Sequence, residues 1–94
     1  MANMEVEYDP NKAKLNPVNH DGVTLSEAET VFYDPYMITK EDPDAEGEQR
    51  MISVGMSKQN RVLIVVWTER GDAIRLISAW KATRPQRRQY EKQF

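Results

Sequence analysis

The chain has no cysteine, a single histidine and only four glycines among its 94 residues. Without cysteine there is no disulfide framework, thiolate zinc site or cysteine nucleophile. No apolar run approaches the roughly 20 residues that a membrane helix needs, and the N-terminus lacks the basic flank of a signal peptide. Metal-ligand spacings, phosphate-binding glycine patterns and nucleophile elbows are also missing. The sequence therefore predicts a cytoplasmic protein with no membrane partner, no metal site and no cofactor.

Charge is distributed unevenly along a chain that is long enough for one small domain, which we expect to span residues 1–94. Residues 1–48 hold twelve acids and three bases, a net charge of −9. Residues 49–94 hold ten bases and three acids, a net charge of +7. Such asymmetry is typical of a basic half that binds a polyanion, a membrane surface or an acidic partner. The plainer alternative is that the acidic half folds against the basic half and neutralises it.

Apolar patterning indicates five strands, of which the fourth is the most informative. The segment 62–67 is apolar at every position, so it should be a central strand with helices on at least one side. The order β-α-α-β-β-β-β-α predicts an α+β fold, with one small antiparallel sheet packed against helices. The predicted strands are residues 4–8, 36–40, 51–56, 62–67 and 73–80.

Three helices are predicted from their start signals. Asp9 before a proline marks the first helix, which we expect to end at Pro17 because the residue before proline avoids helical angles. Thr24 opens the second helix, which Asp34 and its proline should end. Thr83 opens the third. The pairs Thr24–Glu27 and Thr83–Gln86 both match the capping-box pattern.

Three basic residues are predicted to meet at one end of the sheet. A hairpin that turns through Gly71 would place Arg61 opposite Lys81, and Arg84 follows at the start of the last helix. Like charges gather only where a counter-charge or a use exists, and a phosphodiester backbone would supply the counter-charge. The alternative is that these cations point into solvent in different directions.

Two other side chains, His20 and Glu69, have two interpretations each, and the two tryptophans differ in their expected burial. His20 lies in a glycine-flanked loop, where it is either a general acid or base or a loop residue bonded to backbone. Glu69 is either a functional residue, which acts as a base or orients Arg70, or a plain turn residue. Trp67 follows an apolar run and fits the core, whereas Trp80 ends a strand and should be partly exposed.

Several stretches together resemble the BrnT family of bacterial type II toxins over nearly the whole chain. The resemblance implies small endoribonucleases with a RelE-like fold, which cut RNA without a metal ion and so arrest translation. It also implies a BrnA-like antitoxin with a ribbon-helix-helix domain, and contact with operator DNA only through the toxin–antitoxin complex. The stretches are Glu7 to Lys12, Asn16, His20, Gly22-Val23, Glu27-Ala28, Asp34-Pro35, Val65 to Asp72, Arg75 to Ala79, Lys81 to Thr83, Arg87 and Tyr90.

The resemblance also implies roles for the basic residues and for two proton carriers. Arginine and lysine would neutralise the phosphate oxygens, and this electrostatic stabilisation of the transition state is usually the largest contribution to catalysis. His20 or Glu69 would move protons. The residues expected to be catalytic are His20, Glu69, Arg70, Lys81 and Arg84. Those expected to bind RNA are Arg61, Arg75, Arg87 and Arg88.

The chain departs from the family pattern at two places. The family has Lys-His-Gly before a valine, where this chain reads Asn19-His20-Asp21-Gly22. The family also has Ile-Ser-Ala-Arg, where Trp80 takes the arginine position. The alternative function is therefore a catalytically weak or inactive binding module that serves as antitoxin partner and transcriptional co-repressor.

Overall fold

The computed structural model describes residues 5–94, so Met4 of the predicted first strand lies outside the described residues. The element order confirms the predicted α+β class. None of the described helices is long and apolar enough to cross a membrane. The elements are β1 (Glu5–Tyr8), α1 (Pro10–Asn19), α2 (Leu25–Glu29), the 3-10 helix η1 (Thr30–Tyr33), β2 (Ile38–Glu41), β3 (Met51–Met56), β4 (Val62–Arg70), β5 (Ala73–Lys81) and α3 (Arg84–Glu91).

The strands form one five-stranded sheet in the order β1-β5-β4-β3-β2. β4 lies in the middle, as its uninterrupted apolar sequence predicted. The expectation of a wholly antiparallel sheet is wrong at one edge, where β1 runs parallel to β5. β2 to β5 follow one another through loops and pair antiparallel, whereas β1 reaches its place beside β5 from the other end of the chain and no hairpin fixes its direction.

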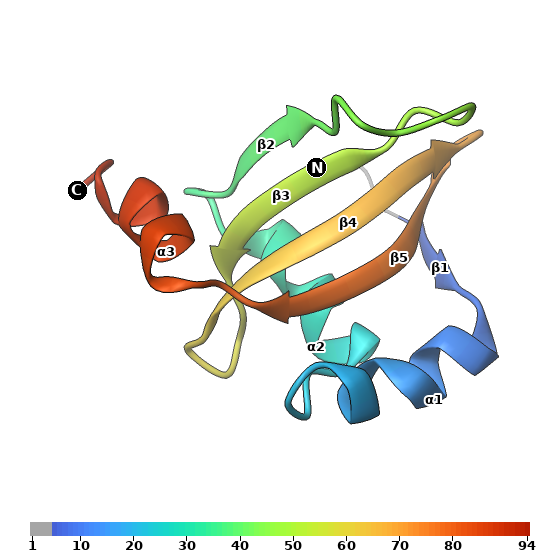
Figure 1. Cartoon of the computed structure of the whole chain (residues 1–94), viewed down its shortest axis with the longest axis horizontal. Coiled ribbons are helices and arrows are strands. Elements are labelled where there is room, and N and C mark those ends of the chain that lie inside the picture. Colours follow the sequence, from blue (N-terminus) through green and yellow to red (C-terminus); the bar gives the residue numbers. More distant parts are fainter. Residues whose placement is uncertain (1–4) are drawn as a thin grey trace.

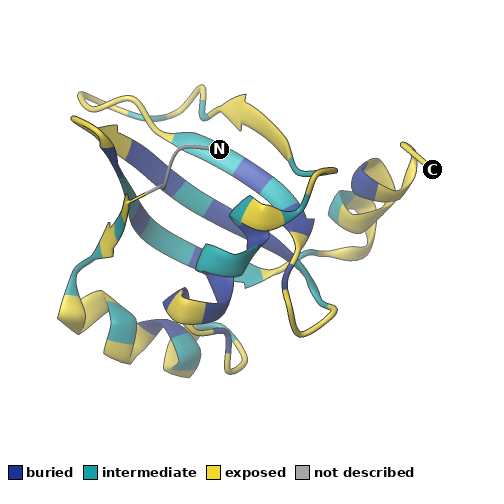
Figure 2. Cartoon of the chain, turned by 180° about the vertical axis from the view of Figure 1, so that it is seen from behind, coloured by how far each residue is buried: buried dark blue, intermediate teal, exposed yellow. Residues whose placement is uncertain are grey.

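The first two helices, α1 and α2, cover one face of the sheet and leave the other face open, while α3 lies at the end of the sheet (Figure 1). The core lies on the covered face, where Leu25 and Val31 from the helices meet Leu63 and Val65 from β4 (Figure 2). Trp67 is buried there too, as predicted, and its indole N–H donates to the Ser53 hydroxyl at 2.8 Å.

The open face of the sheet is apolar as well. Ile52, Val54, Ile64 and Trp80 line a shallow groove between this face and α3. Trp80 is half-buried, as expected for a residue at the end of its strand. It therefore stands between the open face and the last helix, next to Lys81.

Two helix boundaries differ from the prediction. Pro17 lies inside α1, which continues to Asn19, because a proline in the last turn removes only one backbone hydrogen bond. Asp9 caps this helix as predicted, accepting from the Asn11 N–H at 2.7 Å. The second helix tightens into η1 at Thr30 before the chain leaves it at Asp34.

One of the two predicted capping boxes is complete, and the second predicted strand starts later than expected. Thr83 and Gln86 form the complete box that the sequence predicted. Thr24 accepts from the Glu27 N–H at 2.9 Å, but the Glu27 carboxylate turns away from the helix start, so this box is only half formed. The strand predicted at 36–40 begins at Ile38, because residues 34–36 form a turn.

A β-bulge changes the predicted register of the β4–β5 hairpin. Between Val66 and Trp67 the pairing shifts, and Ile77 on β5 has no partner of its own. The pairing next to the turn, with Thr68 opposite Arg75, would place Lys81 opposite Val62, and the bulge moves it by one further residue. Lys81 consequently lies opposite Leu63 rather than opposite Arg61 as predicted. A bulge of this kind inserts one residue into a strand and bends it locally.

Candidate functional site

A hollow forms where the loop after α1 meets the end of β5. His20 and Asp21 line it from the loop, and Trp80 and Lys81 line it from the strand. The rings of His20 and Trp80 lie 5.8 Å apart between centroids and are tilted by 39°. The fold thus brings two of the predicted catalytic residues, His20 and Lys81, to one place.

Asn16, a buried residue of α1, fixes the position of this loop. Its side-chain amide donates to the backbone carbonyls of Val23 at 2.7 Å and Ala79 at 2.9 Å, and its oxygen accepts from the Ala79 N–H at 3.1 Å. β1 covers the edge of β5 only as far as Leu76, so Asn16 satisfies the next backbone groups along that edge. It thereby ties the loop to the strand that carries Lys81.

The loop itself is tightly turned. His20 donates its backbone N–H to Asn16 at 2.9 Å and accepts from the Val23 N–H at 3.0 Å. Asp21 and Gly22 both adopt positive φ angles, of 50° and 79°. The backbone of His20 is therefore fixed by hydrogen bonds, while its ring faces Trp80 and the hollow.

Arg61 faces inward rather than joining a free cationic cluster. Its Nε donates to Glu27 Oε2 at 2.9 Å, and its Nη2 contacts Glu27 Oε1. The Ser57 hydroxyl donates to the same carboxylate at 2.7 Å. The hydrogen bond from Arg61 lowers the pKa of Glu27 against the effect of burial. The charge of Arg61 is thus already neutralised within the protein.

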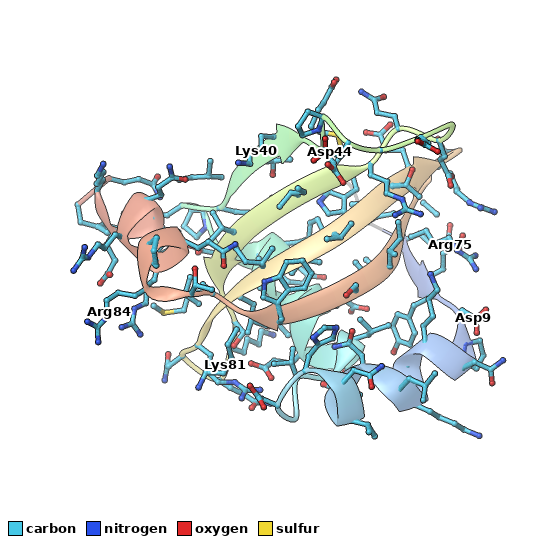
Figure 3. All side chains as sticks on the ribbon, viewed as in Figure 1. Asp9, Lys40, Asp44, Arg75, Lys81 and Arg84 are labelled. Carbon is cyan, nitrogen blue, oxygen red and sulfur yellow. The ribbon has the colours of Figure 1, made fainter. Side chains whose placement is uncertain are left out.

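The basic residues of α3 divide between two faces. Arg87 and Phe94 border a second hollow on the far side of Lys81. Arg84 and Arg88 are exposed and lie on one face of α3, because they are four residues apart. Neither residue lines the His20 hollow or the second hollow. Arg84 points away from the sheet (Figure 3). Arg87 therefore lies near Lys81, where Arg84 was expected.

Glu69 and Arg70 lie at the opposite end of the β4–β5 hairpin. Eight residue steps along β5 separate that end from Lys81, which amounts to about 25 Å. Arg70 pairs with Glu48 of the acidic loop at 3.3 Å, and Glu69 borders a hollow beside the same loop. The predicted catalytic residues are therefore split between two regions.

Ion pairs between the basic half and the acidic half of the chain neutralise part of the opposite charges that the two halves carry. Arg75, on β5, pairs with Glu7 of β1 at 3.5 Å. The Arg61–Glu27 and Arg70–Glu48 pairs also join the basic half to the acidic half. Within residues 5–94, no carboxylate lies within 4.0 Å of the Lys81 ammonium. Neutralisation within the fold and a residual basic surface therefore exist together.

A hydrogen-bonded contact that the sequence did not indicate holds α3 against the protein. The buried Tyr90 hydroxyl donates to Asp34 Oδ2 at 2.5 Å, and the Met56 N–H donates to the same oxygen at 2.8 Å. Burial and the bond to Asp34 raise the pKa of Tyr90 to about 12. Burial opposes ionisation of Asp34, but hydrogen bonds from Met56, Tyr90 and Tyr36 outweigh it and lower its pKa. Because Asp34 and Tyr90 are far apart in sequence, local patterns did not reveal the pair.

The comparisons with known proteins agree on one family. Residues 8–85 match the family model described as "Ribonuclease toxin, BrnT, of type II toxin-antitoxin system". The fold is similar to the 1.1 Å crystal structure of the Brucella abortus ribonuclease toxin BrnT, with a TM-score of 0.63 and 19% identity, covering 87% of this chain and 100% of that chain. No curated protein sequence matches the chain. Among the described residues, no three His, Asp or Glu side chains are grouped as metal ligands.

Proposed function

Because the chain belongs to the BrnT family of type II ribonuclease toxins, which act on RNA and are held by an antitoxin, we propose that it cuts RNA at the His20–Lys81 hollow. The observation that supports this is the meeting of His20 with Lys81 across a loop that Asn16 holds in place. Growth arrest by inhibited translation in the cytoplasm is the expected consequence.

The proposed reaction is a transphosphorylation that needs no metal ion. The 2′-oxygen of a ribose forms a bond to the adjacent phosphorus, and the bond from phosphorus to the 5′-oxygen breaks. The products are a 2′,3′-cyclic phosphate and a 5′-hydroxyl end. Lys81 stabilises the negative charge that grows on the non-bridging oxygens. The proton of the 2′-hydroxyl is lost and the departing 5′-oxygen gains one; His20 serves as the proton carrier at one of these oxygens and water at the other, since an imidazole is a common general acid or base.

The test is cleavage of a defined RNA by the purified chain in excess EDTA. We expect cleavage to persist, with cyclic phosphate ends in the products, and the growth of cells that produce the chain alone to stop. Lys81→Ala should remove both effects. Absence of cleavage by the natural sequence in EDTA, restored by a divalent cation, would overturn the metal-free proposal. Absence of cleavage under both conditions would overturn the active-site proposal.

The antitoxin is proposed to be a BrnA-like protein with a ribbon-helix-helix domain. Such domains dimerise and bind DNA through their own strands, so operator DNA would be contacted by the complex and not by this chain alone. Co-production of a ribbon-helix-helix protein encoded beside this chain should restore growth. Retardation of operator DNA by the isolated toxin as strong as that by the complex would contradict the proposal.

A further inference from the structure

A second hollow opens on the other side of Lys81, between α3 and the turn that precedes β4. Its volume of about 450 Å³ lies within the range of pockets that hold small organic ligands. Lys81 and Arg87 border one part of it, and Phe94 borders another. Lys81 also lines the His20 hollow, so the two hollows meet at this side chain.

The cations of this second hollow differ in their availability to a ligand. Arg61 also borders it, but its charge is taken up by Glu27. Arg87 has only a long contact of 3.8 Å with Glu91, and both side chains are more than half exposed. Exposed ion pairs of this kind contribute little free energy, so Arg87 can exchange Glu91 for a ligand. Glu91 also borders the hollow, so Lys81 and Arg87 together exceed its negative charge by one and are the two cations that can bind an anionic group here.

The exposed ring of Phe94 borders another part of the hollow, and the exposed ring of Tyr36 packs against it from outside the hollow. Phe94 is 71% exposed and Tyr36 is 51% exposed. Their ring centroids lie 4.9 Å apart, and Phe94 lies 5.6 Å from buried Tyr90. The Gln93 side chain donates to the Tyr36 carbonyl at 2.8 Å, which ties the two segments together. An exposed apolar surface in a fixed position is typical of a binding site.

We propose that this second hollow binds one nucleotide of single-stranded RNA next to the phosphate that reacts. The nucleotide's phosphate lies between Lys81 and Arg87, and its base stacks on Phe94, whose ring Tyr36 supports. The inference rests on the proposed function, because it extends the RNA from the His20 hollow across Lys81. Stacking uses the π-face that every base has, so this subsite accepts all four bases.

The test measures binding without cleavage. A fluorescent 2′-fluoro RNA of about eight nucleotides, a length within the usual range of single-strand sites, lacks the 2′-hydroxyl and is not cut. Fluorescence anisotropy then gives its Kd with the full chain. We expect Phe94→Ala to raise Kd by about tenfold, and Phe94→Trp to keep it near that of the natural chain. Phe94→Leu preserves apolar bulk without an aromatic face and should bind as weakly as Phe94→Ala.

Matched controls separate the hollow from general effects of aromatic and basic side chains. Tyr33 is 56% exposed and does not border the hollow, so Tyr33→Ala should leave Kd unchanged. Arg87→Ala should raise Kd and reduce the salt dependence of binding by about one counterion. Lys12→Ala, on the exposed side of α1, should do neither.

The results distinguish the subsite from the function on which it rests. If the natural chain cuts RNA but Phe94→Leu binds as tightly as Phe94→Trp, the stacking subsite is wrong and the nuclease proposal stands. If Arg87→Ala and Lys12→Ala change Kd and its salt dependence equally, the proposed phosphate contact of Arg87 is wrong as well. If the natural chain neither binds nor cuts RNA, the proposed function fails and the subsite fails with it.

Discussion

The two ends of the β4–β5 hairpin carry similar side chains in different surroundings. At the turn end, Arg70 lies 3.3 Å from Glu48, and Glu69 borders the same acidic loop. At the other end, Lys81 has no carboxylate partner among the described residues and lies beside His20. Both ends are exposed, so exposure does not distinguish them. What distinguishes them is whether the positive charge has already been neutralised by the protein.

The two ends also differ in how firmly their loops are held. Asn16 makes three hydrogen bonds that join the loop carrying His20 to β5. The turn after Arg70 is a short hairpin connection through Gly71, whose φ of 60° suits glycine. A cation without a partner, beside a titratable ring on a fixed loop, fits a phosphoryl-transfer site better than a paired cation at a hairpin tip.

The largest expected effect comes from removing the free cation. Lys81→Ala should lower the single-turnover rate of RNA cleavage by at least about 100-fold, because a positioned charge stabilises the transition state. Arg70→Ala, at the other end, should lower it by no more than about threefold, because an exposed pair contributes little. A loss with Arg70→Ala as large as with Lys81→Ala would show that the hairpin tip takes part in the chemistry.

Arg61 and Lys81 are cations that border the same hollow, but only Arg61 is paired with a buried carboxylate. Glu27→Gln keeps the shape of the buried side chain but leaves Arg61 without its anion. We expect the free energy of unfolding to fall by about 3 kcal/mol, as for other buried pairs that lose one partner. Lys81→Ala should change it by less than about 0.5 kcal/mol. Denaturant unfolding measures both, and similar values would contradict the distinction between a structural and a free cation.

The dependence of stability on pH tests the same buried pair. The pKa of Glu27 and that of Asp34 are both lowered in the folded protein. Their contributions are therefore complete above the unfolded pKa values near 4 and are lost as the pH falls through the lower folded values. Stability should decline more steeply between about pH 4.5 and pH 2 in the natural chain than in Glu27→Gln. Parallel curves would show that Glu27 is not the group responsible.

A smaller effect is expected at Asn16, which joins the two walls of the His20 hollow. Asn16→Asp keeps the size but cannot donate to the carbonyls of Val23 and Ala79 when ionised. We expect a loss of about 2 kcal/mol in stability. Well below the melting temperature, we also expect kcat to fall about tenfold, because a displaced group loses its orientation. A stability loss with unchanged kcat would mean that the amide supports the fold without positioning His20.

Local sequence patterns predicted the elements, while long-range contacts decided the site. The apolar run of β4 identified the central strand, which has a neighbour on each side and buries most of its side chains although one face of the sheet is open. The shift that moved Lys81 from Arg61 to Leu63 has two parts: the pairing beside the turn differs by one residue from the prediction, and Ile77, an inserted residue that no composition marks, adds one more. Glu27 matches the capping-box pattern because Thr24 lies three positions before it, yet its carboxylate binds Arg61 instead of the helix start. Pairs so distant in sequence leave no periodic pattern to detect.

The smallest effect is expected at Trp80, where the family resemblance predicts an arginine. The Trp80 side chain lies between two different surfaces, the apolar groove of the open face and the His20 hollow, and it lines both. Trp80→Arg places a second cation beside Lys81 at the position where a phosphate is expected to react. We expect the cleavage rate to rise about threefold, since the added charge is partly offset by lost packing on Ile64 and by repulsion from Lys81. Trp80→Gln, matched in polarity but uncharged, should not raise it. A rise with both variants would mean that the indole ring obstructs RNA, and a fall with both would mean that it supports the His20 ring.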